Sequence, residues 1–339
     1  MIFSLIVTVF NDVEGTRKFL RRMEEQTRKP DEIVILDAGS KDGTWEALED
    51  YARHGSIPVK LLRKERCKPA PSRNLCAKEA SYDVLVVTDI GCDWERVWFE
   101  ELIEPMEKDP LLDAVMGSWR VAWDDQKTEW AKADYFLQGG IELRATPTSL
   151  SANRAIVYKK EFYLGLGGLP EDLTFAGDDT LLARQIQNSG RRIAAASVPR
   201  CTWERPQTFG ALVKESRRYA RGAAEVGLGF RDFCLVATRL SIEVLMLMAG
   251  IIMLLLRMPT GGLLSLVAVA LLVGSRLLKL RRRRDKRAKP RQTVSFWRLG
   301  VLEYATKMAG MRGWLEGFLY GQKHCQESRR KVRGLRSIA

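Results

Sequence analysis

Short apolar runs alternate with amphipathic segments through the first 120 residues of this chain. Five runs are predominantly apolar, as strands buried on both faces are, and they cover residues 2–10, 32–36, 59–62, 84–88 and 114–119. Most of the segments between them place apolar residues at helical spacing. This strand and helix alternation predicts an α/β fold, with a mostly parallel sheet that carries helices on both faces.

Aspartates follow two of the predicted strands and begin a later helix. Asp37 comes after the run at 32–36, Asp89 closes the run at 84–88, and Asp178 and Asp179 head an amphipathic helix. Ligand sites of open parallel sheets form where the strands end. Acids placed there can hold a nucleotide, a divalent metal and a reacting hydroxyl in one crevice.

Each of these acids suits a different task. Asp37, in the stretch Asp-Ala-Gly-Ser-Lys-Asp-Gly-Thr, can accept hydrogen bonds from a base or a ribose, and its glycines allow a tight turn. Asp89 is placed to share Mg²⁺ or Mn²⁺ with substrate phosphates. One aspartate of the pair at 178–179 can act as a general base. The alternative for all three places is structural, as strand-end turns and helix caps.

Composition argues against several other classes of chemistry. None of the six cysteines forms a Cys-x-x-Cys pair, so a zinc or redox site is not expected. The two histidines, His54 and His324, lie in polar stretches, which argues against Ser-His-Asp or Cys-His catalysis. Much of the formal net charge of +13 lies in the C-terminal third, beside apolar segments. That position indicates anionic lipid headgroups rather than nucleic acid as the partner.

Two apolar segments of the C-terminal third approach the length that a bilayer requires, roughly 20 residues. Residues 244–256 carry no charge and extend back to about residue 234, an extension in which Arg239 and Glu243 are spaced to pair with each other. The second segment covers residues 261–278, and Arg276 near its end is placed to extend toward the membrane surface. We expect a transmembrane hairpin. Two buried core helices are the alternative.

The segment after the hairpin, residues 279–291, is densely basic, and basic loops stay in the cytoplasm. The N-terminus reads as a strand rather than a secretory signal. We therefore expect a multi-pass protein of the inner (plasma) membrane with a cytoplasmic N-terminal domain. The predicted division is 1–230 for the α/β domain, 231–280 for the hairpin, and 281–339 for a basic cytoplasmic segment with an amphipathic interfacial helix at 294–320 and a tail.

The order of these motifs resembles that of family 2 glycosyltransferases with the GT-A fold, over roughly residues 1–225. The resemblance rests on Thr8-Val9-Phe10-Asn11, the Asp-x-Gly-Ser-x-Asp-Gly-Thr stretch from Asp37 to Thr44, Ser72-Arg73-Asn74, Thr88-Asp89-Ile90-Gly91-Cys92, Gly168-Leu169-Pro170-Glu171 and Gly177-Asp178-Asp179. Trp203-Glu204-Arg205-Pro206 and the stretch from Arg217 to Gly222 are similar to signatures of a membrane-bound bacterial branch with C-terminal transmembrane helices.

The resemblance implies a Rossmann-like GT-A domain that uses Mg²⁺ or Mn²⁺, with Asp179 as the catalytic base and Asp178 beside it. It implies that nucleotide sugar is bound by Thr8, Phe10, Asn11, Asp37, Gly39, Ser40, Arg73, Thr88, Asp89 and Arg218, with Asp89 also the metal ligand. Gly91 replaces the second aspartate of the family's metal motif, and Asp93 is the substitute candidate. The Gln and Trp of the processive synthases' Gln-x-x-Arg-Trp motif are absent near Arg218, which argues against polymer synthesis.

These features predict an inverting, metal-dependent hexosyltransferase. The donor would be a nucleotide-diphosphate sugar, and the acceptor a membrane lipid, a polyprenyl-linked glycan or a surface polysaccharide. A nucleotidyltransferase is disfavoured, because Asp12 and Glu14 stand where a triphosphate loop would lie. A non-catalytic membrane scaffold that binds nucleotide sugar or anionic lipid is the remaining alternative. We expect donor choice to depend on residues 120–150 and on the loop at 145–155.

Overall fold

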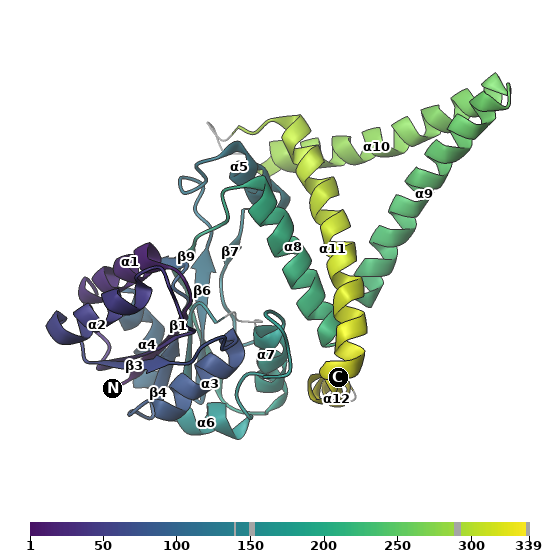
Figure 1. Cartoon of the computed structure of the whole chain (residues 1–339). Coiled ribbons are helices and arrows are strands. Elements are labelled where there is room, and N and C mark those ends of the chain that lie inside the picture. The colour runs from purple at the N-terminus through teal and green to yellow at the C-terminus, as the bar shows by residue number, and fades with distance from the viewer. Residues whose placement is uncertain (139, 149–152, 288–292, 337–339) are drawn as a thin grey trace. The chain divides into compact units, whose positions relative to one another are not determined.

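The computed structural model describes residues 1–138, 140–148, 153–287 and 293–336. The chain divides into two compact units. The first unit comprises Met1–Ala122, Ile141–Glu204 and Gly321–Ala339, and the second comprises Trp123–Gly140 and Arg205–Tyr320 (Figure 1). This division by contacts does not test the predicted boundaries at residues 230 and 280, which concern the membrane and stay predictions.

A nine-stranded sheet forms the centre of the first unit, within the described ranges. Its strands are β1 (Ser4–Val9), β2 (Glu32–Asp37), β3 (Val59–Arg63), β4 (Val84–Val87), β5 (Cys92–Trp94), β6 (Ala114–Arg120), β7 (Glu142–Leu143), β8 (Ile156–Lys159) and β9 (Ile193–Trp203). They run in the order β3-β2-β1-β4-β8-β6-β9-β5, with β7 beside β6. The first four are parallel, whereas β8 is antiparallel to both β4 and β6. The sheet is therefore mixed: four of the five predicted runs form its parallel part, and the fifth, β6, is antiparallel to β7 and β8.

Helices pack on both faces of this sheet. They are α1 (Val13–Glu24), α2 (Thr44–His54), α3 (Pro69–Glu79), α4 (Trp98–Lys108), α6 (Lys160–Gly165), α7 (Asp178–Asn188) and α12 (Gln326–Arg336). Ile6 and Leu36 belong to a core that also contains buried residues of α3, α6 and α7. Their neighbours Leu5 and Ile35 point the other way along each strand and are also fully buried. Burial of both faces explains why these strands read as continuous apolar runs.

The second unit is helical. It contains α5 (Glu129–Gln138), α8 (Phe209–Glu225), α9 (Phe230–Leu255), α10 (Pro259–Arg287) and most of α11 (Phe296–His324). Helix α5 lies within residues 120–150, and it joins α8, α10 and α11 in a small core around Phe136, Leu212 and Leu302. The aromatic residues of that region pack there, and Trp123 meets Phe136 edge to face at 5.6 Å.

Helices α9 and α10 are long and apolar enough to cross a membrane, with mean hydropathy of 1.9 and 2.0 over their most apolar windows. Only 11% of each window is buried, so they are not core helices of the described structure. They form the predicted hairpin, and the glycines Gly250 and Gly262 let the two backbones approach closely, because a Cβ on Gly262 would lie 2.9 Å from the carbonyl oxygen of Gly250.

One prediction about this hairpin is wrong. Arg276 was expected to extend toward the membrane surface, but its side chain is 5% exposed. Its guanidinium forms two hydrogen bonds with Glu303 of α11, from Nε at 3.1 Å and from a terminal nitrogen at 3.3 Å. Arg276 is buried because it pairs with the carboxylate of Glu303, which lies on a third helix. The sequence does not indicate that this helix is near Arg276. Arg239 and Glu243 pair as expected, at 3.5 Å.

A buried ion-pair triad stabilises the second unit. Arg205 donates to Asp134 from Nε and from a terminal nitrogen, at 3.0 and 2.8 Å, and lies 2.6 Å from a carboxylate oxygen of Glu215. Burial raises the pKa of Glu215 even though Arg205 opposes the shift. Two segments of the family resemblance, around Arg205 and Glu215, therefore meet in a structural contact between α5 and α8.

Replacing Arg205 with methionine is expected to destabilise the second unit. The variant leaves Asp134 and Glu215 buried without their cation, and removing one partner of a buried ion pair costs about 3–5 kcal/mol. The melting temperature of the purified full chain in detergent, followed by tryptophan fluorescence, should fall by several degrees. Arg218→Met is the control, because Arg218 is exposed and no ion pair is found for it among the described residues. Equal melting temperatures for the two variants would contradict a stabilising role for the triad.

Candidate active site

The carboxyl ends of three parallel strands bring most of the predicted site residues to one edge of the sheet. Strand β1 pairs with β2 in the register Val9 to Asp37, and with β4 in the register Ile6 to Val87. The residues just beyond Val9 and Val87 therefore lie at the same edge as Asp37. These are Phe10, Asn11, Thr88 and Asp89, so the nucleotide and metal segments of the sequence share one edge.

Asp37 organises the loop that follows it. Its carboxylate is fully buried and accepts hydrogen bonds from the Ser40 backbone N–H at 3.0 Å and from the Ser40 hydroxyl at 2.5 Å. Arg63 lies 3.8 Å away and also stacks over the ring of Trp45. Gly39 has φ +92°, and a Cβ there would lie 3.1 Å from the Glu65 backbone, so the turn requires glycine. In this conformation Asp37 shapes the loop and exposes no oxygen to a ligand.

The loop after β1 is tied to the loop after β2. The Asn11 backbone N–H donates to the Ser40 hydroxyl at 2.8 Å, and the Asn11 side-chain oxygen accepts from the Lys41 N–H at 2.9 Å. Asn11 adopts φ 49°, a left-handed conformation that asparagine tolerates better than most residues. Phe10 beside it is 59% exposed. Phe10 and Asn11 are thus exposed beside a turn that hydrogen bonds hold in place, whereas Thr8 is half-buried within β1.

Thr88 and Asp89 differ in their access to solvent. Thr88 is fully buried, and its hydroxyl donates to the Arg154 carbonyl oxygen at 2.7 Å and accepts from the Trp94 indole at 3.0 Å. Thr88 therefore supports the strand end and has no exposed polar atom. The Asp89 side chain is 31% exposed. A Cβ at Gly91 would meet no described atom within 4 Å, so the space beside the Asp89 loop is open.

Arg73 of α3 connects the strand-end acid to the helix-start acid. Its guanidinium donates to Asp89 through one terminal nitrogen and lies 3.7 Å from Asp178 through the other. The residue is 8% exposed, and its Nε is buried with no hydrogen-bond partner in the described structure. Burial opposes the charge of Arg73, but Asp89 and Asp178 outweigh burial and raise its pKa. Acids far apart in the sequence thus meet around one cation.

The acid pair begins α7. Gly177 precedes the helix with φ 91°, and both acids lie in its first turn, where the helix dipole favours negative charge. Asp178 is buried, and burial together with the Asp179 carboxylate raises the pKa of Asp178 to about 6, although Arg73 opposes this shift. Asp179 is partly exposed, and one of its oxygens accepts from the Thr180 N–H at 2.7 Å. Asp178 is thus engaged with Arg73, while Asp179 is the more accessible acid.

Asn74 positions the loop that leads to the acid pair. Its side-chain nitrogen donates to the Leu169 carbonyl and to Glu171, both at 2.8 Å, and its side-chain oxygen accepts from the Leu169 N–H and from the Tyr163 hydroxyl. A Cβ on Gly168 would lie 2.4 Å from that oxygen. Asn74 belongs to the motif Ser72-Arg73-Asn74 of the family resemblance, but no role was predicted for it. Its adjacency to Arg73 in a motif is the signal that could have identified it.

The C-terminal helix α12 holds the same loop from the other side. Ser328 donates to the two carboxylate oxygens of Asp172 through its N–H, at 3.1 Å, and through its hydroxyl. The Cys325 thiol donates to the Asp172 carbonyl at 3.1 Å. No local pattern indicates this contact, because 156 residues separate Asp172 from Ser328. The segment expected to be a basic tail therefore contributes to the architecture of the first unit.

Two further predicted residues lie elsewhere. Asp93 points to Lys18 and Arg22, at 3.1 and 2.8 Å, and these cations lower its pKa even though burial opposes them. Within the described ranges, no three His, Cys, Asp or Glu side chains form a metal-binding group. Arg218 belongs to the second unit, and its contact with the nucleotide sugar stays a prediction. Of the loop at 145–155, residues 149–152 lie outside the described residues.

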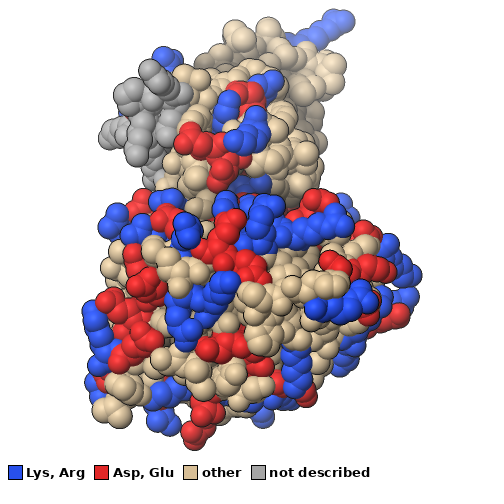
Figure 2. Space-filling model, turned by 90° about the vertical axis from the view of Figure 1, so that its left-hand side faces the viewer, with Lys and Arg blue, Asp and Glu red and all other residues tan. Residues whose placement is uncertain are grey.

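The surface around these elements carries both signs of charge. On the face drawn in Figure 2, basic and acidic side chains are interspersed. Arg200, for example, pairs with Glu95 at 2.7 Å and with Glu101 at 2.8 Å. The net positive charge of the chain is therefore not gathered into one basic patch on this face.

Comparisons with known proteins place these features in a family. Residues 4–163 match glycosyl transferase family 2. Glycosyltransferase AglE of Haloferax volcanii is 23% identical over 225 residues, which cover 66% of this chain and 73% of AglE. Poly-beta-1,6-N-acetyl-D-glucosamine synthase of Staphylococcus aureus is 25% identical over 236 residues, which cover 68% of this chain and only 56% of the synthase.

A solved structure shares the fold. Mannosyltransferase PcManGT of Pyrobaculum calidifontis, in complex with GDP-Man and Mn²⁺, aligns with a TM-score of 0.57 at 20% identity, over 92% of this chain and 86% of that chain. The mixed sheet, the strand-end acids and the sequence match agree with one another and with the predicted GT-A fold. Over residues 4–163 the chain matches glycosyl transferase family 2, and its fold is the GT-A fold.

Proposed function

We propose that this chain is an inverting glycosyltransferase that moves a sugar from a nucleotide-diphosphate sugar to a hydroxyl of a membrane-associated acceptor. The single observation that carries the proposal is the position of Arg73 between Asp89 and Asp178, with Asp179 adjacent. Through that contact Asp89, which is suited to bind a metal and a diphosphate, lies one arginine side chain away from Asp178. Asp178 and Asp179 are the acids suited to deprotonate an acceptor. The relatives named above, which act on glycans by name, support the same class of reaction.

The nucleotide would bind over the joined loops after β1 and β2. Phe10 offers an exposed ring for stacking on a base, and Asn11 and Lys41 border the same turn. Asp37 and Ser40 would act by holding this turn, since the Asp37 carboxylate is fully buried and accepts hydrogen bonds from Ser40. We therefore propose a supporting role for Asp37, Gly39 and Ser40, and a contacting role for Phe10 and Asn11.

The donor set at Asp89 fits a divalent metal that is shared with substrate. Mg²⁺ and Mn²⁺ sites of this kind use one or two carboxylates and complete their coordination with phosphate oxygens and water. Asp89 gives one carboxylate oxygen to Arg73 and is partly exposed beside open space at Gly91, so its second oxygen is available there. A bound metal would neutralise the charge that develops on the departing diphosphate. The Mn²⁺ in the Pyrobaculum mannosyltransferase complex supports this cofactor without deciding between Mn²⁺ and Mg²⁺.

Asp179 would act as the general base. It would take the proton of the acceptor hydroxyl while that oxygen forms a bond to the anomeric carbon, and the bond from this carbon to the diphosphate oxygen breaks with its electron pair on the nucleotide diphosphate. Attack from the face opposite the leaving group inverts the anomeric configuration. Asp178 would hold Arg73 in place and keep the first turn of α7 negative, which stabilises the base in its position.

The acceptor would be presented by a membrane. Large apolar side chains are exposed along α9 and α10, including Leu245, Ile252, Leu264 and Leu271. Water does not favour such a surface, whereas lipid chains do. We propose that the two helices insert as a hairpin in the plasma membrane, with the GT-A domain on the cytoplasmic side, and that α11 lies at the interface. A lipid, a polyprenyl-linked glycan or a surface polysaccharide are the acceptor classes that this placement allows.

Asp179→Asn is expected to lower kcat by about 10²–10⁴-fold, because the amide cannot accept the hydroxyl proton. Sugar transfer and nucleotide release would be measured with UDP- and GDP-sugars and membrane lipid extracts. Nucleotide binding, followed by the thermal shift with UDP or GDP and Mn²⁺, should be unchanged. Full turnover by the variant would remove Asp179 from the mechanism. Nucleotide binding by wild type without turnover on any extract would favour the non-catalytic scaffold.

Asp89→Asn and Asp93→Asn should separate the two candidate metal ligands. The first variant is expected to lose the stimulation of activity by Mn²⁺, because Asp89 is the available carboxylate. The second should keep that stimulation, since Asp93 is engaged with Lys18 and Arg22. Activity would be titrated against Mn²⁺ for both variants. An Asp89→Asn enzyme that retained the wild-type Mn²⁺ dependence would contradict the assignment.

The rate should fall as the pH drops through about 6. The pKa of Asp178 is raised to about 6, so the group is ionised above that pH and neutral below it, where Arg73 loses one partner. A raised acid pKa means that protonation favours the folded state, so between pH 7 and 5.5 this group should not lower the melting temperature. In Asp178→Asn the acidic limb of kcat/KM should move toward the ordinary carboxyl range near 4. An unchanged limb at about 6 in this variant would disprove the assignment.

A further inference from the structure

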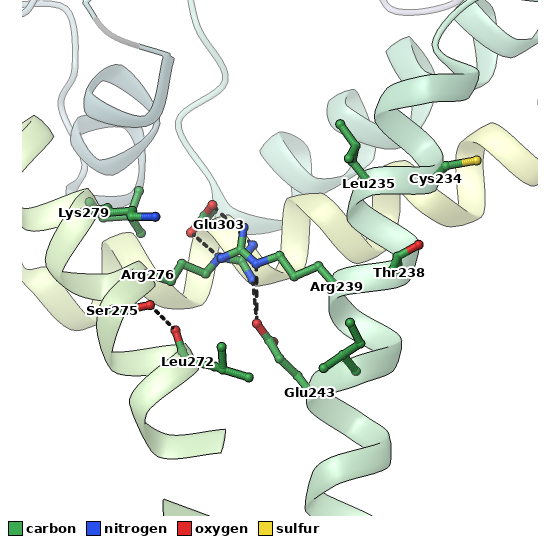
Figure 3. Close-up of a pocket in the computed structure, with 12 residues that line it drawn as sticks. Cys234, Leu235, Thr238, Arg239, Glu243, Leu272, Ser275, Arg276, Lys279 and Glu303 are labelled. Carbon is green, nitrogen blue, oxygen red and sulfur yellow. Dashed lines mark hydrogen bonds and ion pairs between the residues drawn. The ribbon is translucent and has the colours of Figure 1, made fainter. Parts of the chain in front are cut away.

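A cavity with charged residues in its lining lies between three helices of the second unit. It has a volume of about 600 Å³ and is bordered by α9, α10 and α11. Its charged lining comprises Arg239 and Glu243 of α9, Arg276 and Lys279 of α10, and Glu303 of α11. Figure 3 shows Arg239 and Arg276 reaching toward each other from the two hairpin helices, with Glu243 beside them. Charged groups within such apolar helices are costly and indicate function.

The cavity exists because the two hairpin helices diverge. Near their turn, Gly250 and Gly262 bring the backbones into contact, and Ser265 donates to the Met246 carbonyl at 2.7 Å. Away from the turn the helices separate, as Figure 1 shows, and α11 crosses the open end. Apolar side chains, among them Leu235, Ile242 and Leu272, complete the walls. The cavity therefore has a charged centre and apolar sides.

The cations of the cavity exceed its carboxylates. Arg276 holds Glu303, and Glu243 is shared by Arg276 at 3.6 Å, Arg239 at 3.5 Å and the Tyr304 hydroxyl at 3.0 Å. One terminal nitrogen of buried Arg276 has no hydrogen-bond partner in the described structure. Lys279 has neither an ion pair nor a hydrogen bond among the described residues. Three cations and two carboxylates leave one positive charge and free donors, which an anion would satisfy.

The position of the charges along the hairpin matches one level of a bilayer. Arg239 precedes the turn at Arg257 by 18 residues, and Arg276 follows it by 19. At about 1.5 Å per residue this is roughly 27–29 Å, close to the ~30 Å thickness of the hydrocarbon core. If the turn lies at one membrane surface, the cavity lies at the headgroup level of the other, where lipid phosphates are found.

We propose that this cavity binds the phosphate of an anionic membrane lipid. The proposal rests on the membrane insertion in the proposed function. Arg239, Lys279 and the terminal nitrogen of Arg276 that makes no hydrogen bond and lies 3.6 Å from Glu243 would contact the phosphate, and the apolar walls would contact the acyl chains. A freely soluble phosphate would gain nothing from those walls, so a lipid is the favoured source. Basic pockets between membrane helices bind anionic headgroups in this manner.

The test measures lipid retention by the full-length chain. Protein in a mild detergent would be incubated with dioleoylphosphatidylglycerol or dioleoylphosphatidylcholine, and bound lipid counted by native mass spectrometry. Lys279→Gln and Arg239→Gln are expected to lower phosphatidylglycerol retention about fivefold each, the effect of removing one cation near a lipid headgroup. Both side chains are partly exposed, so folding should be preserved. Arg276 is not substituted, because it also holds Glu303.

Arg281→Gln is the matched control. Arg281 lies two residues from Lys279 on the same helix, is exposed, does not line the cavity, and forms only an exposed pair with Asp285 at 3.8 Å. Its loss should change retention less than twofold. Equal retention of the two lipids by wild type, or equal losses in Lys279→Gln and Arg281→Gln, would overturn the proposal. Displacement of the lipid by millimolar inorganic phosphate would assign the site to a soluble anion instead.

Flotation with phosphatidylcholine vesicles separates this proposal from the function on which it rests. A chain that fails to float contradicts membrane insertion and with it the lipid site. A chain that floats but does not prefer phosphatidylglycerol contradicts the lipid site alone. Because retention is measured without a sugar donor, a chain that retains the lipid but transfers no sugar would support the site and contradict the proposed transferase activity.

Discussion

The guanidinium of Arg73 is the contact on which the candidate site depends. A buried cation is costly unless it is paired, and the two carboxylates that pair with it belong to the end of β4 and the start of α7. Because α3 carries Arg73 between these elements, its charge fixes the distance between two acids that are separated by 89 residues of sequence. The same contact sets the electrostatics: it holds Asp178 partly ionised against the burial and the like charge that raise its pKa.

Neutral hydrogen bonds hold the rest of the site around that cation. Asn74, the residue after Arg73, uses its whole amide to hold the loop at 168–171, and Ser328 of the C-terminal helix holds Asp172 a few residues further on. The loop before α7 is thus fastened on two sides, which lets an irregular segment present Asp179 in a defined position. On the nucleotide side, Ser40 serves the same purpose by joining Asp37 to Asn11. Rigid turns of this kind reduce the entropy that a bound ligand would otherwise have to remove.

Charge in the second unit is arranged differently from charge in the first. Arg205, Arg217 and Arg276 each meet a carboxylate from another helix, so much of the positive charge stabilises helix packing. Lys279 and the basic residues after it lack such partners or lie beyond the described residues, and they follow directly on an exposed apolar hairpin. The combination of apolar length and positive charge at one end is the basis of the proposal that this unit binds anionic lipid.

The sequence alone determined the parallel strands β1 to β4, the strand-end acids, the apolar hairpin and the family resemblance, because buried strands, apolar helices and short motifs are local patterns. Strands β8 and β9 were not predicted: the first passes directly into α6, and the second is rich in alanine and contains Pro199. Helix α5 was not predicted, because its apolar residues do not recur at a clear helical spacing. Only the tertiary structure decided that Asp37 and Thr88 are buried supports, that Asp93 faces other cations, that Arg276 pairs with Glu303, and that α12 joins the first unit. Each of these depends on which distant side chain fills the remaining hydrogen-bonding capacity of a buried group, and no local pattern in the chain encodes that choice.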